Sequence, residues 1–166
     1  MKAVVGLAIF LCLWLSSCNS EPSLQKYFVE NTENKNFIAL DISSSILNVD
    51  QAKLSLEQQQ ALQSFEKINI LAFKRNPNNT AEFETERAKL NGILKNPKYQ
   101  QLMKIGSGKE GASVSFVGTD EHIEEFVLFA NQKETGFAVV RVLGKDMNST
   151  HIMNMMSVLQ QSRIDL

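Results

Sequence analysis

The stretch YQQLMKIGSGKEGASVSFVGTDEHIEEFVLFANQKETGFAVVRVLG, residues 99–144, decides the fold of this chain. It contains four segments of strand length: Tyr99–Ile105, Ser113–Val117, Ile123–Ala130 and Phe137–Leu143. Glycine, asparagine and aspartate separate the segments, and short strands joined by short turns are typical of an antiparallel meander. In the second segment Val114 and Phe116 alternate with Ser113 and Ser115, which predicts one buried apolar face and one solvated face.

The residues before the meander predict strands and helices that complete a core. The apolar runs Phe37–Ile42 and Ile68–Phe73 supply one or two N-terminal strands. A capping box of Ser55 with Gln58 starts a helix that extends to about Glu66. A second helix begins at Asn79, which is a residue type that caps helices, and ends near Lys95.

The residues after the meander predict a last helix over Thr150–Gln161. Ile152, Met155, Met156 and Leu159 fall at i, i+3, i+4 and i+7, so they form one apolar stripe that suits packing on the meander. The predicted fold class is α+β. It is an antiparallel sheet, with a four-strand C-terminal meander plus one or two N-terminal strands, packed against amphipathic helices in two layers.

The N-terminal residues predict a lipoprotein signal peptide over residues 1–17. Lys2 precedes an apolar run that is too short for an unassisted transmembrane helix, and Leu15-Ser-Ser-Cys18 resembles the lipobox of bacterial lipoproteins. Acylation of Cys18 would attach the protein to a membrane. A plain secretory signal with an accidental cysteine, or an uncleaved anchor, remain alternatives. We expect residues 18–35 to contain the lipidated cysteine and a tether, and residues 36–166 to form a single α+β domain.

Charge and cysteine content restrict the function further. The chain carries 17 Lys and Arg against 18 Asp and Glu, a net charge of −1, which argues against nucleic acid as a partner. The two cysteines are Cys12, inside the predicted signal peptide, and Cys18, so no thiol remains for a disulfide, a metal or catalysis. The residue after Cys18 is Asn19, which is not the aspartate that retains some lipoproteins in the inner membrane, so the outer membrane is favoured.

The sequence contains no catalytic signature. The glycines of Ile105–Gly111 fit a hairpin turn, because the spacing and flanking residues of a phosphate-binding loop are missing. Alternation along a strand would place His122 with Glu124 and would separate both from Glu121 and Glu125. His151 has no nucleophile or carboxylate partner by pattern, and capping or solvent exposure is its expected role. We therefore expect no catalytic residue, no metal and no cofactor.

The order of these segments resembles a family of small bacterial envelope lipoproteins that carry a domain of unknown function. The resemblance covers Phe37–Leu159 and is carried by Ile68–Phe73, Ser113–Val117, Ile123–Phe129 and Gly136–Gly144. It implies a place in the cell envelope, facing the periplasm or the surface. Some members are encoded near regulators of transcription, which implies a role in envelope sensing. The resemblance carries over no site residue.

Two hypotheses about function follow. The first is a non-enzymatic, lipid-anchored module that binds an envelope protein, and it expects an exposed apolar patch on the free face of the meander or an unpaired strand edge. The second is an envelope enzyme or small-ligand carrier. Its site would be assembled from scattered residues such as His122, Glu125 and Arg141, which should then converge in a cleft.

Overall fold

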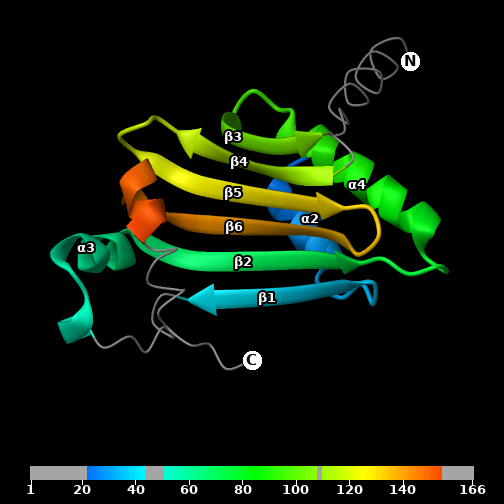
Figure 1. The fold of residues 1–166 in the computed structure, drawn as a ribbon, viewed down its shortest axis with the longest axis horizontal. Coiled ribbons are helices and arrows are strands. Elements are labelled where there is room, and N and C mark those ends of the chain that lie inside the picture. Colours follow the sequence, from blue (N-terminus) through cyan, green and yellow to red (C-terminus); the bar gives the residue numbers. More distant parts are fainter. Residues whose placement is uncertain (1–21, 44–50, 108–109, 155–166) are drawn as a thin grey trace, which may run out of the picture.

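The computed structural model of this protein describes residues 22–43, 51–107 and 110–154 (Figure 1). In chain order its elements are α2 (Leu24–Asn31), β1 (Phe37–Ser43), the 3-10 helix η2 (Gln51–Lys53), α3 (Leu56–Ser64), β2 (Phe65–Lys74), α4 (Thr80–Leu94), β3 (Gln100–Ser107), β4 (Glu110–Gly118), β5 (Ile123–Gln132) and β6 (Gly136–Met147). Residues 149–154 are also helical.

The six strands form one antiparallel sheet in the order β1-β2-β6-β5-β4-β3. The predicted α+β fold is confirmed, with a meander from β3 to β6 and two N-terminal strands. The chain leaves β2 through α4 and re-enters the sheet at its far edge, as β3. The meander then returns strand by strand until β6 pairs with β2, so the two parts of the sheet join in its centre.

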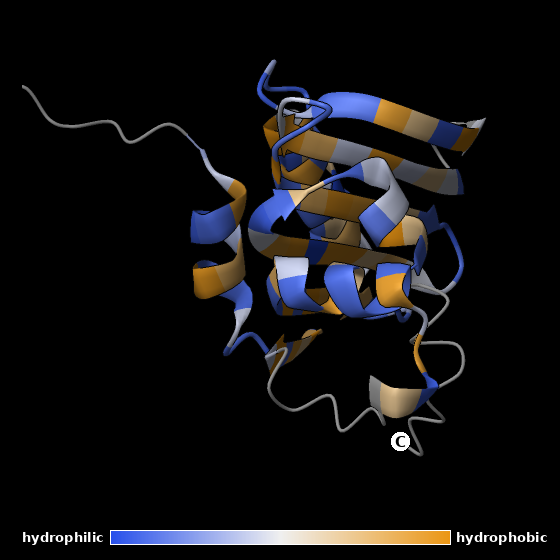
Figure 2. Ribbon diagram, turned by 90° about the vertical axis from the view of Figure 1, so that its left-hand side faces the viewer, coloured by the Kyte–Doolittle hydropathy of each residue, from blue (hydrophilic) through white to orange (hydrophobic). Residues whose placement is uncertain are grey.

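One face of the sheet is covered by α2 and α4, and Figure 2 shows α2 standing to one side of the strands. Side chains from both helices pack with the aromatic residues of the sheet. Phe73 lies 5.0 Å from Phe37, 5.5 Å from Phe137 and 5.9 Å from Phe83, measured between ring centroids. These rings come from four different elements, so this cluster holds α4 and the edge strand β1 to the centre of the sheet.

Helix α2 lies within the part of the chain that the sequence analysis assigned to a tether. Leu24 and Tyr27 are almost fully buried in the core cluster beneath this helix. The folded domain therefore starts before residue 36, and only residues N-terminal to α2 remain for a tether.

The opposite face of the sheet is covered at one end only, among the described residues. Here α3 and residues 149–154 meet Phe65, Phe126 and Met147 in a second core cluster. The predicted capping box is present, with Ser55 and Gln58 each accepting a hydrogen bond from the other's backbone. Ile152 is buried as expected. The rest of the predicted stripe, Met155 to Leu159, lies outside the described residues.

Two local predictions are corrected. Asn79 stands at the N-cap of α4, but its side chain makes no capping bond. Its amide donates to Lys74 O and Asn36 Oδ1 instead, because Asn79 is buried between the β2–α4 loop and the start of β1. On β4, Ser115 is buried on the helix-covered side rather than solvated. Pairing places Ser113 beside Phe129 on that same side.

The predicted glycine hairpin is confirmed. Gly106 and Gly111 pair across β3 and β4 with φ angles of 84° and 148°. A Cβ on Gly111 would lie 2.1 Å from Ile105 O, so the close approach of the two strands requires glycine at this position.

Candidate functional site

His122, Glu125 and Arg141 do not converge in a cleft. Glu125 and Arg141 form an ion pair on the helix-covered side, with Arg141 Nε 2.6 Å from Glu125 Oε1. His122 lies in the turn before β5 with 70% of its side chain exposed, and its Nδ1 is 2.9 Å from Asp146 Oδ1. The turn begins at Thr119, whose backbone exchanges hydrogen bonds with His122. The hypothesis of an enzyme or carrier built on these three side chains is therefore wrong.

The prediction for residues 121–125 assumed one unbroken strand, but β5 starts at Ile123 and its pairing with β4 shifts by one residue there. Ile123 pairs with Gly118 and Glu125 with Val117, so Glu124 is an extra residue in β5. The extra residue moves Ile123 into the second core cluster, while Glu125 faces α2. A bulge of this kind leaves no mark in the alternation of residue types.

The ion pair belongs to a buried polar network beneath α2. The guanidinium of Arg141 also donates to Gln25 Oε1 in α2 and to Glu125 Oε2. Burial and the negative charge of Glu125 raise the pKa of Tyr99 to about 12, against the opposing effects of a hydrogen bond with the Leu24 backbone and the charge of Arg141. Because the carboxylate is occupied by its arginine, this network serves to attach α2 to the sheet.

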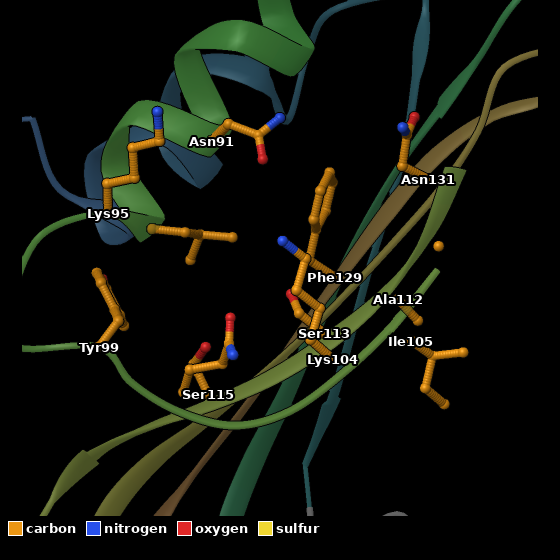
Figure 3. Close-up of a pocket in the computed structure, with 13 residues that line it drawn as sticks. Asn91, Lys95, Tyr99, Lys104, Ile105, Ala112, Ser113, Ser115, Phe129 and Asn131 are labelled. Carbon is orange, nitrogen blue, oxygen red and sulfur yellow. The ribbon is translucent and has the colours of Figure 1, made fainter. Parts of the chain in front are cut away.

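A small pocket opens between the C-terminal end of α4 and strands β3 to β5 (Figure 3). It has a volume of about 190 Å³ and is lined on the sheet side by Ser113, Ser115 and Phe129, and on the helix side by Asn91 and Lys95. These side chains could hydrogen-bond a small polar molecule. The chain's two histidines lie elsewhere, so neither could serve as a base for the serines.

The described residues show no group of three or more His, Cys, Asp or Glu side chains that could hold a metal ion. No helix in residues 22–43, 51–107 and 110–154 is long and apolar enough to cross a membrane.

The largest unexplained feature is the part of the second sheet face that borders the second core cluster, where the side chains are partly buried or exposed and Ile70, Val114 and Val140 pack against that cluster. Two rows of paired residues cross all six strands there, and we call them together the aliphatic face. The row nearer α3 is Leu40, Ile70, Val140, Leu128, Val114 and Met103. The outer row is Ile38, Ala72, Ala138, Ala130, Ala112 and Ile105.

The aliphatic face is exposed at both edges of the sheet. Ile38 and Leu40 on β1 are 62% and 43% exposed, and Met103 and Ile105 on β3 are 49% and 60% exposed. The outer row has alanine on all four central strands, and a shallow hollow of about 580 Å³ lies over three of them. Contiguous apolar surfaces of a few hundred Å² are often functional.

The dimensions of the aliphatic face follow from sheet geometry. Six strands about 4.8 Å apart span about 24 Å, and two rows of side chains cover about 14 Å along the strands, giving roughly 340 Å². A β-strand edge borders the face at each end, because β1 and β3 have no outer neighbour among the described residues. Sequence patterning could have found this face: β2, β5 and β6 carry apolar residues at successive positions, so both of their sides are apolar.

Comparison with known proteins gives one match. A family model described as "Domain of unknown function (DUF4252)" matches residues 27–155, which include every element from the middle of α2 to β6. No curated protein and no solved structure matches the chain.

Proposed function

We propose that this chain, which belongs to the family of the domain of unknown function DUF4252, is a lipid-anchored, non-enzymatic interaction module of the bacterial cell envelope. The aliphatic face is the observation that carries this proposal. Acylation of Cys18 would hold the domain at the membrane, and the aliphatic face would bind a partner protein there.

The size of the aliphatic face favours a segment of a partner over a second copy of the chain. Two copies packed face to face would bury roughly 700 Å² in total, which is below the roughly 1,200 Å² of stable protein interfaces. The width of about 14 Å instead suits one α-helix, whose diameter with side chains is about 10–12 Å. We therefore propose an envelope protein that presents an apolar helix as the partner.

The flat row of alanines supports helix binding. Ala72, Ala138 and Ala130 lie side by side on β2, β6 and β5, and the larger Val140 and Leu128 form a step along one side of them. A helix resting on small side chains approaches the sheet backbone closely, and the step gives it lateral contacts. Polar Lys74 and Gln132 border the hollow on its other side.

Charge substitutions on exposed residues test this proposal. The acylated chain is crosslinked in intact cells of the organism that makes it, and captured proteins are identified by mass spectrometry. The face variant combines Leu40→Lys with Met103→Lys. Its matched control combines Val29→Lys with Ala88→Lys, two exposed apolar residues on α2 and α4, the helices that cover the opposite face of the sheet.

We expect the wild type and the control to capture the same protein, and the face variant to lose it. A Cys18→Ala chain should lose it as well, because the domain would leave the membrane. Capture of that protein by the face variant would place binding elsewhere on the domain. Absence of any captured protein from the wild type, or crosslinks to lipid alone, would contradict a protein-binding function.

A further inference from the structure

The pocket between α4 and strands β3 to β5, which we call the α4 pocket, contains a buried polar side chain that the fold does not satisfy. Ser115 lines this pocket and is only 8% exposed. Among the described residues, nothing donates a hydrogen bond to its hydroxyl or accepts one from it. Because a buried hydroxyl without a hydrogen bond destabilises a fold, Ser115 indicates that water or a ligand enters the α4 pocket and completes its bonding.

The charged side chains of the α4 pocket are both positive. Lys95 follows the last residue of α4 and Lys104 lies on β3, and none of the described residues that line the pocket is Asp or Glu. Other lysines of the chain pair with carboxylates: Lys26, Lys67, Lys89 and Lys145. Neither Lys95 nor Lys104 forms an ion pair with a described residue, so both ammonium groups can attract an anion.

Strand pairing brings the polar groups together on the sheet side of the α4 pocket. Lys104 pairs with Ser113 across β3 and β4, and Gln101 pairs with Ser115. Side chains that stand opposite each other on paired strands lie about 5 Å apart, so a ligand bound to the Lys104 ammonium can also reach the serine hydroxyls. Asn91 lies across the pocket from them on α4, as Figure 3 shows.

Another part of the lining is apolar and is supplied by Leu94, Tyr99 and Phe129. Tyr99 and Phe129 are buried in the first core cluster, so packing fixes the positions of their rings. Binding sites for small molecules commonly combine such apolar walls with a few polar groups that fix the orientation of the ligand. The α4 pocket therefore suits a molecule with an apolar body and an anionic group.

The volume of the α4 pocket and the direction of α4 limit the size and the charge of the ligand. A cavity of about 150 Å³ holds benzene, so about 190 Å³ has room for about eight non-hydrogen atoms. Because α4 ends at Leu94, the negative end of its dipole lies beside the pocket. That end opposes a second negative charge on the ligand, which favours a singly charged anion.

We infer that the α4 pocket binds a small organic acid as its singly charged carboxylate. Lys104 and the hydroxyls of Ser113 and Ser115 hold the carboxylate. The rings of Tyr99 and Phe129 contact the apolar body. These side chains lie on the other side of the sheet from the aliphatic face, so the inference goes beyond the proposed function and needs no partner protein.

Titrations followed by nuclear magnetic resonance test the inference. The purified, isotope-labelled full chain is titrated with butyrate, hexanoate and benzoate, and separately with the neutral amides of the same shape, butyramide, hexanamide and benzamide. Inorganic phosphate serves as the more highly charged anion. The backbone amide signals of Ser113 and Ser115 report binding in the α4 pocket, and that of Lys133, in the turn between β5 and β6, reports effects elsewhere on the domain.

We expect at least one carboxylate to shift the signals of Ser113 and Ser115 saturably and to bind at least about tenfold more tightly than its amide, which lacks the charge. Lys104→Met should weaken that binding at least about fivefold, because a charge-assisted hydrogen bond is lost. Lys133→Met, which removes an exposed lysine outside the pocket, should leave it unchanged. Ser115→Ala should weaken binding about threefold without lowering the urea midpoint, because its hydroxyl bonds to no described residue.

Three results would overturn the inference. The first is the absence of a saturable shift at Ser113 and Ser115 with every carboxylate. The second is an amide, or phosphate, that binds as tightly as the best carboxylate. The third is unchanged affinity in the Lys104→Met or the Ser115→Ala chain. The titrations involve no membrane and no partner protein, so their outcome is separate from that of the capture experiment in cells.

Discussion

Removing one partner of the Glu125–Arg141 ion pair should destabilise the protein strongly. The two side chains are 9% and 12% exposed, and two Arg141 nitrogens lie 2.6 and 3.3 Å from the carboxylate oxygens. Arg141→Met keeps most of the side-chain volume but leaves the carboxylate buried without its cation. Breaking a buried pair in this way costs about 3–5 kcal/mol.

Replacing both partners should cost less than replacing one. In the double variant Glu125→Leu with Arg141→Met, no charge stays buried, and the new side chains adjoin Val127 and Val139 in the first core cluster. Replacement of a whole buried ion pair by apolar residues is often neutral or stabilising by about 1–4 kcal/mol. The double variant should therefore have a larger free energy of unfolding than Arg141→Met alone.

Urea unfolding followed by circular dichroism measures both effects. With a denaturant slope of about 1–3 kcal/mol per molar, a loss of about 3–5 kcal/mol lowers the midpoint by at least about 1 M. The control is Glu66→Gln, which breaks the exposed pair of Glu66 with Lys145 and should change stability by less than about 1 kcal/mol. A loss of less than about 1 kcal/mol for Arg141→Met, or a double variant less stable than the single one, would refute the reasoning.

Three further measurements test the fold. Burial raises the pKa of Tyr99 from the ordinary value of 10.0 to about 12, and it raises the pKa of Tyr27 further. Above pH 10 the folded protein therefore binds more protons than the unfolded chain, so the free energy of unfolding should fall between pH 10 and 12. Tyrosinate absorbance, which reports only on these two tyrosines, should rise near pH 10 in urea and later in the folded protein; coincident titrations would show solvated rings. Gly136→Ala should lower the free energy of unfolding by at least about 2 kcal/mol, because φ is 131° and a Cβ would lie 1.9 Å from a carbonyl oxygen of β2. In the same urea titration Gly92→Ala should stabilise the protein by about 0.5–1 kcal/mol, because a Cβ on this residue of α4 would meet no other atom within 4 Å. Ser55→Ala should lower the free energy of unfolding by about 1 kcal/mol, because α3 loses its N-terminal cap. An unchanged thermal unfolding curve would show that the capping box does not contribute to stability.

Much of the fold could be predicted because its signals are local. Glycine turns and strand-length apolar runs located the meander, and the Ser55–Gln58 pattern located α3, since each of these depends on a few neighbouring residues. Phe65 shows where local spacing fails. Helical periodicity assigned it to the end of α3, yet it begins β2, because pairing with Gly144 of β6 extends the strand.

The candidate site depended on information that neighbouring residues do not contain. The alternation of Ser113 and Ser115 with Val114 and Phe116 was recognised correctly, but it could not show which side of β4 the helices cover. The serines face the pocket beneath α4, and Val114 belongs to the aliphatic face. That face exists only when six strands are in register, so its twelve residues are assembled by long-range pairing.

The claim that the aliphatic face is the interaction surface is tested most directly by site-specific photo-crosslinking in cells. A photoreactive amino acid replaces Ile38 or Ile105, at opposite ends of the outer row, or Val29 or Ala88 as exposed controls on the helices of the opposite sheet face. The account predicts that Ile38 and Ile105 crosslink to the same envelope protein and that the controls do not. Crosslinks from Val29 or Ala88 with none from Ile38 and Ile105 would contradict it.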